Sequence, residues 1–253
     1  MTKIDDCRTK LRALDKWDSY LLKESGLPGP RGNLELAQAV ADEGNRKLFL
    51  QYIAYTADKA PVNSPYEFLA FCGIVGLGRL LGEGNKDLLK ILRRHASDQR
   101  WRIREAVAMA LQRLGDADME RLIVEMRVWA QGTPLEQRAA AAALCEPRLL
   151  GQAKHAREVL RIVDRITASL EGADNRRTED FLILRQGLGY CWSVAVVALP
   201  IEGKAHMEKW LVKSDKDVQW IMRENLKKAR LARMDADWVK KWRSRSARAL
   251  GGR

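Results

Sequence analysis

The sequence predicts an all-α protein, an α-solenoid built from stacked pairs of helices. Apolar residues recur with the period of a helix along most of the 253 residues, and no stretch alternates apolar and polar residues as a half-buried strand does. Short segments rich in Gly, Pro, Asn and Asp separate these periodic stretches. A short motif also occurs twice, and internal repetition is typical of solenoids, in which each two-helix unit buries its apolar stripe against its neighbours.

Each expected helix is a periodic stretch bounded by turn residues. The boundaries include the Gly- and Pro-rich segment 26–33 and the segment 200–203, where Pro200 ends a long apolar run. The expected helices cover residues 5–24, 34–43, 45–59, 65–82, 86–96, 99–114, 118–131, 134–145, 153–171, 178–198, 204–213, 217–232 and 236–248. The expected organisation is an N-terminal helix and linker over residues 1–33, a repeat solenoid over residues 34–235 and a basic C-terminal helix or tail over residues 236–253.

The composition excludes several classes of protein. Lys and Arg number 45 against 33 Asp and Glu, a net charge of +12, and 46% of the residues are hydrophobic, as in a basic globular protein and not a disordered one. The longest uncharged runs are shorter than the ~18 apolar residues of a membrane span, and the polar N-terminus lacks the apolar region of a secretory signal. We therefore expect a cytoplasmic protein without a transmembrane segment. The four cysteines and three histidines lack metal-ligand spacing, so no metal or cofactor is expected.

The positive charge is concentrated in two places. Residues 204–253 hold fifteen Lys and Arg and six Asp and Glu, a net charge of +9, which leaves +3 for the first 203 residues. Within those first residues, a second cluster contains Arg100, Arg102 and Arg104. Clustered cations are typical of surfaces that bind the phosphate groups of nucleic acids.

The repeated motif lies at the start of two expected helices. Residues 98–105 and 217–224 share the pattern D-x-x-W-x-[IM]-R-E. Because an Asp just before a helix accepts hydrogen bonds from free N–H groups, we expect N-caps at Asp98 and Asp217. The motif arginines, with weaker counterparts elsewhere, are expected to reach an Asp or a carbonyl of a neighbouring repeat, and contact with a ligand is the alternative. These arginines are Arg104, Arg138, Arg185 and Arg223.

In these residues the chain resembles the HEAT-repeat family, whose second helix often opens with an Asp, an apolar or aromatic residue and then an Arg. The matching residues are Asp98-x-x-Trp101-x-Ile103-Arg104. The resemblance extends over about residues 34–235 and implies a solenoid of two-helix repeats. Proteins of this family bind proteins or nucleic acids, so the resemblance alone does not decide between these partners.

A narrower pattern, Ser97-Asp98-x-x-Trp101-x-x-Arg104-x-Ala106, resembles a DNA-facing helix start of the HEAT-like DNA glycosylases that excise alkylated purines. This resemblance implies that Arg104 contacts a backbone phosphate. Those enzymes also carry a tryptophan and an aspartate one helical turn apart in the preceding repeat. Phe68-Leu69-Ala70-Phe71-Cys72, which occupies that place here, departs from this pattern.

Two Trp–Glu pairs are the candidates for catalysis. Trp101 with Glu105, and Trp220 with Glu224, are spaced i,i+4 and therefore lie on one face of a helix. An aromatic ring that stacks on a cationic nucleoside, beside a carboxylate that stabilises an oxocarbenium-like centre, suits cleavage of a glycosidic bond. The same positions are also typical of packing between helices and of a carboxylate near a helix N-terminus.

The C-terminal segment supplies most of the candidate nucleic-acid-binding residues. Cations recur along the expected helix 217–232, and in the tail they are interleaved with two tryptophans. A solvated tail, an end cap of the solenoid and a membrane-surface helix are the alternatives for the tail. The candidates are Arg100, Arg102, Arg104, Arg223, Lys227, Lys228, Arg230, Arg233, Lys240, Lys241, Arg243 and Arg245, with the aromatic residues Trp101, Trp220, Trp238 and Trp242.

The expected function is that of a HEAT-repeat binding module that engages nucleic acid, with DNA favoured, through basic surfaces. The alternatives are a protein–protein interaction scaffold and a DNA glycosylase-like protein of alkylation repair, and a glycosylase is the one enzymatic activity considered. Basic residues on the inner helices would favour nucleic acid, whereas a neutral or apolar groove would favour a protein partner.

Overall fold

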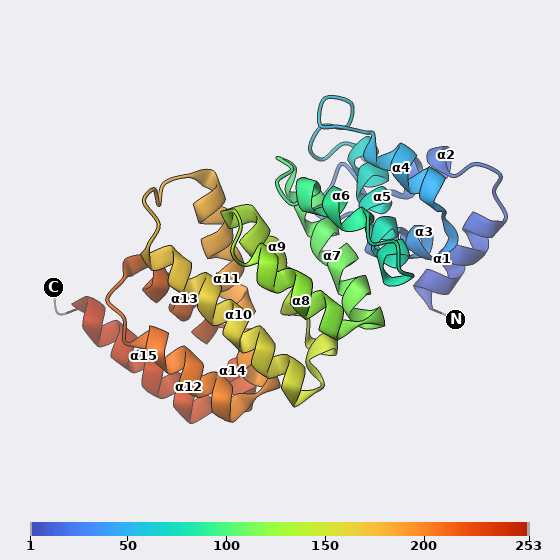
Figure 1. Ribbon diagram of the computed structural model, residues 1–253. Helices are drawn as coiled ribbons and strands as arrows, with labels where there is room; N and C mark the ends of the chain where they lie inside the picture. The colour runs from blue at the N-terminus through green and yellow to red at the C-terminus, as the bar shows by residue number, and fades with distance from the viewer. Residues whose placement is uncertain (1, 252–253) are drawn as a thin grey trace. The chain divides into compact units, whose positions relative to one another are not determined.

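The structure, a computed structural model, describes residues 2–251 and contains helices and no strand in that range (Figure 1). The all-α prediction is confirmed. The chain divides into two compact units, Met1–Asp118 and Met119–Arg253. We describe each unit by itself.

The first unit is built around one long central helix, α5. Its helices are α1 (Lys3–Arg12), α2 (Asp18–Glu24), α3 (Leu34–Glu43), α4 (Arg46–Ile53), α5 (Pro65–Gly82), α6 (Leu88–His95) and α7 (Trp101–Ala117). Helix α5 packs against α2, α3, α4, α6 and α7, and α1 packs against α3. The N-terminal helix and linker expected over residues 1–33 are therefore integral parts of this unit.

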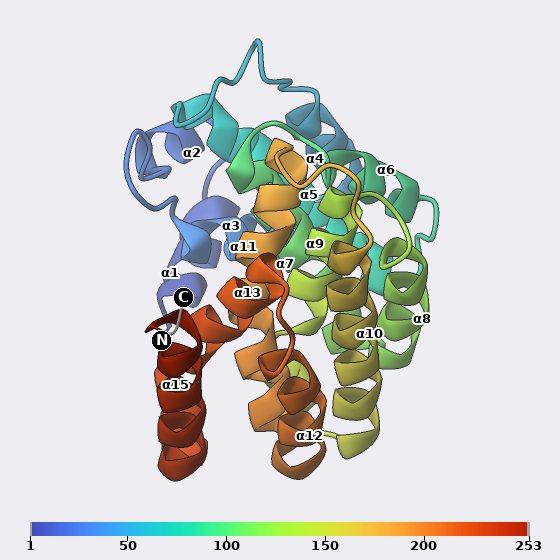
Figure 2. The ribbon, with the colours of Figure 1, turned by 90° about the vertical axis from the view of Figure 1, so that its left-hand side faces the viewer.

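The second unit consists of stacked helix pairs. Its helices are α8 (Met119–Trp129), α9 (Pro134–Leu144), a short 3-10 helix η1 (Pro147–Leu150), α10 (Ala153–Glu171), α11 (Glu179–Ala198), α12 (Pro200–Leu211), α13 (Lys216–Leu226), α14 (Ala229–Met234) and α15 (Ala236–Gly251). In one layer α11 lies between α9 and α13, and in the other α10 lies between α8 and α12 (Figure 2). Consecutive helices of the two layers pack as pairs, which is the arrangement of α-solenoid repeats. The C-terminal helix α15 packs against α13 and α14.

Helix α11 is the one helix of the described chain that is long and apolar enough to cross a membrane. Just over half of its apolar window, 56%, is buried inside the protein. Because α9, α10, α12 and α13 all pack against it, α11 has the environment of a core helix.

Glycines allow the helices of the first unit to approach closely. A Cβ atom at Gly78 of α5 would lie 2.4 Å from the Cα atom of Ala110 on α7, and one at Gly76 would lie 2.3 Å from the ring of Phe49 on α4. Real Cβ atoms do not come so close to other heavy atoms. The Gly-rich stretch 73–78 therefore serves close packing of helices.

The observed N-caps differ from the expected ones. Helix α13 is capped by Asp215, whose carboxylate accepts hydrogen bonds from the backbone N–H groups of Asp217 and Val218, so the N-cap predicted at Asp217 is wrong. Asp98 lies two residues before the N-cap of α7 and accepts a hydrogen bond from the N–H of Arg100 at 2.8 Å. The N-cap of α7 is Arg100, so the N-cap predicted at Asp98 is also wrong, and the Asp98 carboxylate instead binds the N–H of the N-cap residue.

Several helix boundaries also differ, and the helix expected over 45–59 ends at Ile53. The helix expected over 5–24 is interrupted after Arg12, where the indole Nε1 of Trp17 donates to the carbonyl of Leu11. The helix expected over 217–232 ends at Leu226, whose carbonyl accepts from the guanidinium of Arg243 on α15. Pro200 begins α12 instead of preceding it, because proline at the first helical position loses no hydrogen bond.

The close approach of α5 and α7 leads to a first prediction. We expect Gly78→Ala to lower the stability of the protein by about 1–3 kcal/mol, because the new methyl group meets the backbone of Ala110. The control is Gly151→Ala, whose Cβ would meet nothing within 4 Å and should change stability by less than about 0.5 kcal/mol. Urea unfolding followed by circular dichroism measures both, and equal changes would contradict the close approach.

Candidate nucleic-acid interface

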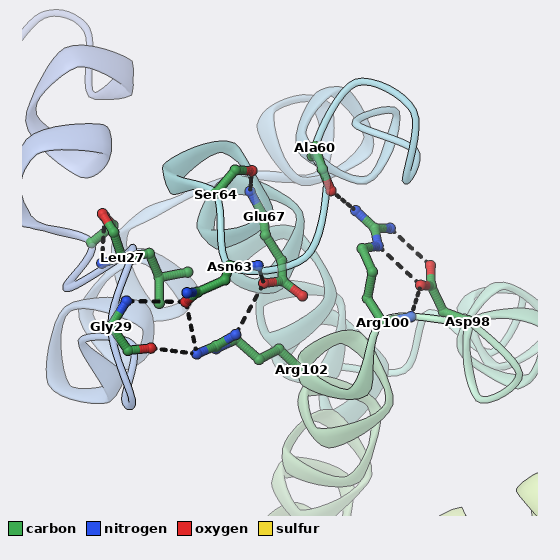
Figure 3. Close-up of polar contacts among 10 residues, drawn as sticks. Leu27, Gly29, Ala60, Asn63, Ser64, Glu67, Asp98, Arg100 and Arg102 are labelled. Atoms are coloured by element: carbon green, nitrogen blue, oxygen red, sulfur yellow. Dashed lines mark hydrogen bonds and ion pairs between the residues drawn. The ribbon is translucent and has the colours of Figure 1, made fainter. Parts of the chain in front are cut away.

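The first basic cluster of the sequence lies inside the first unit. Arg100 is 2% exposed, and its guanidinium donates to both carboxylate oxygens of Asp98 and to the carbonyl of Ala60 (Figure 3). It also donates to the carbonyl of Tyr55. Burial alone would raise the pKa of Asp98, but the hydrogen bonds from Arg100 outweigh it and hold that pKa below its ordinary value. The pair at the start of α7 therefore holds the loop between α4 and α5 in place.

Arg102 is buried in a second polar network of the same unit. Its guanidinium lies 3.3 Å from the carboxylate of Glu67, which is fully buried, and it donates to the carbonyl of Gly29 at 2.7 Å (Figure 3). The side-chain oxygen of Asn63 accepts from Arg102 and from the N–H of Gly29. The loop before α3 and the start of α5 are thereby tied to α7.

Arg104 completes this buried group. It is 8% exposed and donates to the carbonyls of Asp98 and Gln99, in the turn that precedes its own helix. A buried charge needs such partners because loss of hydration is costly. The three arginines expected to contact phosphate are therefore engaged by their own chain and do not form an exposed basic surface.

The other motif arginines lie in the second unit. Arg185 of α11 donates to the carboxylate of Asp217 at 2.7 Å, so it reaches an Asp of the next helix pair as expected. Arg138 of α9 packs against α11, where a Cβ at Gly187 would lie 3.2 Å from its Cγ atom. Arg223 of α13 is partly exposed.

The first Trp–Glu pair lies at the edge of a pocket. Trp101 is 48% exposed and Glu105 is half-buried, and both line a pocket of about 280 Å³ in the first unit together with Phe68 and Phe71. The guanidinium carbon of Arg102 lies 4.4 Å from the centroid of the Trp101 ring. An aromatic wall beside a carboxylate is thus present, as the glycosidic chemistry requires.

The second Trp–Glu pair is used in packing. The guanidinium of Arg185 lies over the ring of Trp220, 4.6 Å from its centroid, and Gly189 of α11 leaves room for the edge of that ring. The carboxylate of Glu224 pairs with the ammonium of Lys227 at 2.5 Å. These contacts join α13 to α11 and favour the structural interpretation of this pair.

The tryptophans of the tail are buried and hold α15 against the unit. Trp238 is 8% and Trp242 is 5% exposed. Both indole Nε1 atoms donate to one oxygen of Glu208 on α12, at 2.7 Å and 3.2 Å. The tail is therefore a docked end helix, and its tryptophans are not available to stack on bases.

We use the name C-terminal basic surface for a set of exposed cations on α13, on the turn that follows it, on α14 and on α15. Among the described residues, only Lys227 of this set has a carboxylate partner. Arg243 uses part of its guanidinium on the carbonyl of Leu226. The set consists of Arg223, Lys227, Lys228, Arg230, Arg233, Lys240, Lys241, Arg243 and Arg245, all partly or fully exposed.

An exposed tyrosine lies among these cations. Tyr190 of α11 is 44% exposed, with the guanidinium carbon of Arg230 4.6 Å and the ammonium of Lys228 5.7 Å from its ring centroid. Its hydroxyl accepts a hydrogen bond from Arg230. Arg230 and Arg233 also line an open pocket of about 620 Å³ with an apolar floor that includes Val194. Tyr190 is not among the predicted site residues, because it lies within an apolar run and has no basic pattern around it in the sequence.

The described residues form no cluster of three His, Cys, Asp or Glu side chains that could hold a metal ion. Three of the four free cysteines are buried. Loss of hydration raises the pKa of the Cys72 thiol.

No protein-family model, curated protein or solved structure matches this chain.

The buried position of Arg100 leads to the second prediction. Arg100→Ala leaves Asp98 without its ion-pair partner and two loop carbonyls without donors, so we expect a loss of stability of about 3–5 kcal/mol. Arg94→Ala, which removes an exposed arginine from α6, should cost less than about 0.5 kcal/mol. Thermal or urea unfolding checks both variants. Equal stabilities would mean that Arg100 is exposed in solution.

Proposed function

We propose that this chain is a HEAT-repeat-like binding module that engages nucleic acid, DNA in the first place, through the C-terminal basic surface. One observation carries the proposal. The cations of this surface lack carboxylate partners, apart from Lys227, whereas the arginines at the start of α7 are buried on acidic or carbonyl oxygens. Exposed cations that the protein does not neutralise are free to bind an anionic partner.

The arrangement of these cations suits a polyanion. They come from three successive helices of one unit and from the turn between the first two. Exposed lysines and arginines that bind phosphates release condensed counterions. Such binding weakens steeply with salt, by a factor that reports how many phosphates are contacted. Binding to a protein partner through an apolar interface would depend much less on salt.

The third prediction tests this surface. The variant Lys227→Gln, Lys228→Gln, Lys240→Gln, Lys241→Gln should bind a short DNA duplex at least about tenfold more weakly near 100 mM salt. The reason is that each lost phosphate contact reduces the number of counterions that binding releases. The slope of log affinity against log salt should also become shallower. Fluorescence anisotropy at several salt concentrations measures both quantities.

The first unit offers a matched control. Lys3, Lys10, Lys86 and Lys90 are exposed, and their replacement by Gln changes the net charge by the same amount. This control should keep its affinity and its salt slope within about twofold. If the control loses as much as the test variant, attraction is due to net charge alone. If the unchanged protein does not bind DNA, the proposal fails and a scaffold for protein partners takes its place.

The pocket beside Trp101 and Glu105 favours a second candidate function, excision of a cationic, alkylated purine from DNA. The ring could stack on the charged base, which leaves as a neutral purine with the electron pair of the glycosidic bond. The carboxylate could stabilise the positive charge that develops at the sugar and accept a proton from the water molecule that adds to the sugar carbon. The proposal rests on these two side chains at the edge of one pocket.

The fourth prediction belongs to this candidate. The unchanged protein should release alkylated purines from methylated DNA, and Glu105→Gln should lower the release rate at least about a hundredfold while DNA binding is retained. Glu224→Gln, at the pair used in packing, is the control and should keep the rate. Chromatography of the released bases measures the reaction, and no release by the unchanged protein eliminates this function.

A further inference from the structure

A small pocket in the second unit brings together cations that are distant in the sequence. The end of α12, one side of α13 and one side of α15 form its walls, and its volume is about 250 Å³. Its cations are Lys213, Arg223 and Arg245, and Gln219 adds a side-chain amide. None of the described residues that line this pocket is an Asp or a Glu.

The spacing of residues along α13 and α15 explains why several polar side chains line this pocket. Gln219 and Arg223 are spaced i,i+4 on α13, and Trp242 and Arg245 are spaced i,i+3 on α15. The guanidinium carbon of Arg245 lies 5.0 Å from the centroid of the Trp242 ring. Because Glu208 holds the indole of Trp242, Arg245 rests on a ring that the fold keeps in position.

The carboxylates near this pocket are already used elsewhere. Asp215 pairs with Arg176 and caps α13, and Asp217 pairs with Arg185. Of the three pocket cations, Lys213 has a carboxylate within 3.2 Å, that of Glu171. Arg223 and Arg245 have no carboxylate partner among the described residues, so the pocket keeps positive charge that an anion can neutralise.

We propose that this pocket binds a phosphomonoester carried by a small organic body such as a nucleoside. A phosphomonoester has a charge of about −1.5 to −2 at pH 7 and three acceptor oxygens. The two guanidinium groups without a carboxylate partner, those of Arg223 and Arg245, match that charge and supply forked donors. Leu211 and Val212, which are partly and largely exposed, provide an apolar wall for a ring.

The size of the pocket favours a terminal phosphate group over a phosphate within a continuous nucleic-acid backbone. A phosphodiester within a strand carries one charge and extends in both directions, whereas about 250 Å³ accommodates a phosphoryl group and little more than one ring. A free nucleotide and the phosphorylated end of a nucleic acid share this chemistry. Only the second source rests on the proposed function.

The fifth prediction uses adenosine 5′-monophosphate and adenosine as probes of the full chain. Isothermal titration calorimetry should show the monophosphate binding at least about tenfold more tightly than the nucleoside. The double variant Arg223→Gln, Arg245→Gln should lose at least about tenfold of that affinity. Equal binding of the two probes would overturn the proposal.

The chain offers a control of equal charge. Arg233 and Lys240 are exposed on α14 and α15 and line no part of this pocket, so Arg233→Gln, Lys240→Gln should bind the monophosphate within about twofold of the unchanged protein. If the control loses as much affinity as the pocket variant, binding is due to the general charge of this end, and the pocket assignment fails.

Short oligonucleotides with a 5′-phosphate or a 5′-hydroxyl group show whether the phosphomonoester belongs to a nucleic-acid end or to a free nucleotide. Tighter binding of the phosphorylated strand, lost in the pocket variant, assigns the pocket to nucleic-acid ends. Equal binding of both strands, with the monophosphate still bound, assigns it to a free nucleotide. If neither strand binds but the monophosphate does, the proposed nucleic-acid function fails and the pocket assignment stands.

Discussion

The first unit depends on the two buried guanidinium groups at the start of α7. The loops around residues 25–33 and 54–64 have no regular ladder of hydrogen bonds, so their carbonyl groups need donors from elsewhere. Arg100 and Arg102 supply these donors and pair with Asp98 and Glu67 (Figure 3). These hydrogen bonds join the start of α7 to both loops, so the three segments form one cooperative structure. Two buried atoms of this network, Glu67 Oε1 and Arg102 Nε, have no hydrogen-bond partner among the described residues.

This role explains why a run of cations in a sequence does not by itself indicate a binding surface. Arg100, Arg102 and Arg104 follow each other at every second position, which on a helix spreads them around the axis. Their position could be decided only by the loops that pack against α7, and the bonded residues of those loops lie 39 to 73 positions away in the chain. The helices were predictable because their signals, periodicity and turn residues, are local. The break after Arg12 was not, because it depends on the indole of Trp17.

In the tail, by contrast, the local spacing of residues does predict the structure, and two interpretations of it, an end cap and a basic surface, both apply. Trp238 and Trp242 are spaced i,i+4, so one side of α15 is buried and its cations are left on the others. The end cap and the basic surface therefore belong to the same helix. The sequence could not predict that Lys213, Arg223 and Arg245 line one pocket, because this depends on how three helices pack.

Docking of α15 also lowers the conformational entropy that its segment would lose on binding a partner. A basic segment that is disordered must lose conformational entropy when it binds, and this lowers the affinity that each contact can contribute. Burial of two tryptophans against α12 orders the segment during folding instead. Glu208 accepts neutral indole donors there, so its interaction with the tail uses none of the basic side chains. The cations of α15 are thus held in place by the aromatic side chains and remain available for a polyanion.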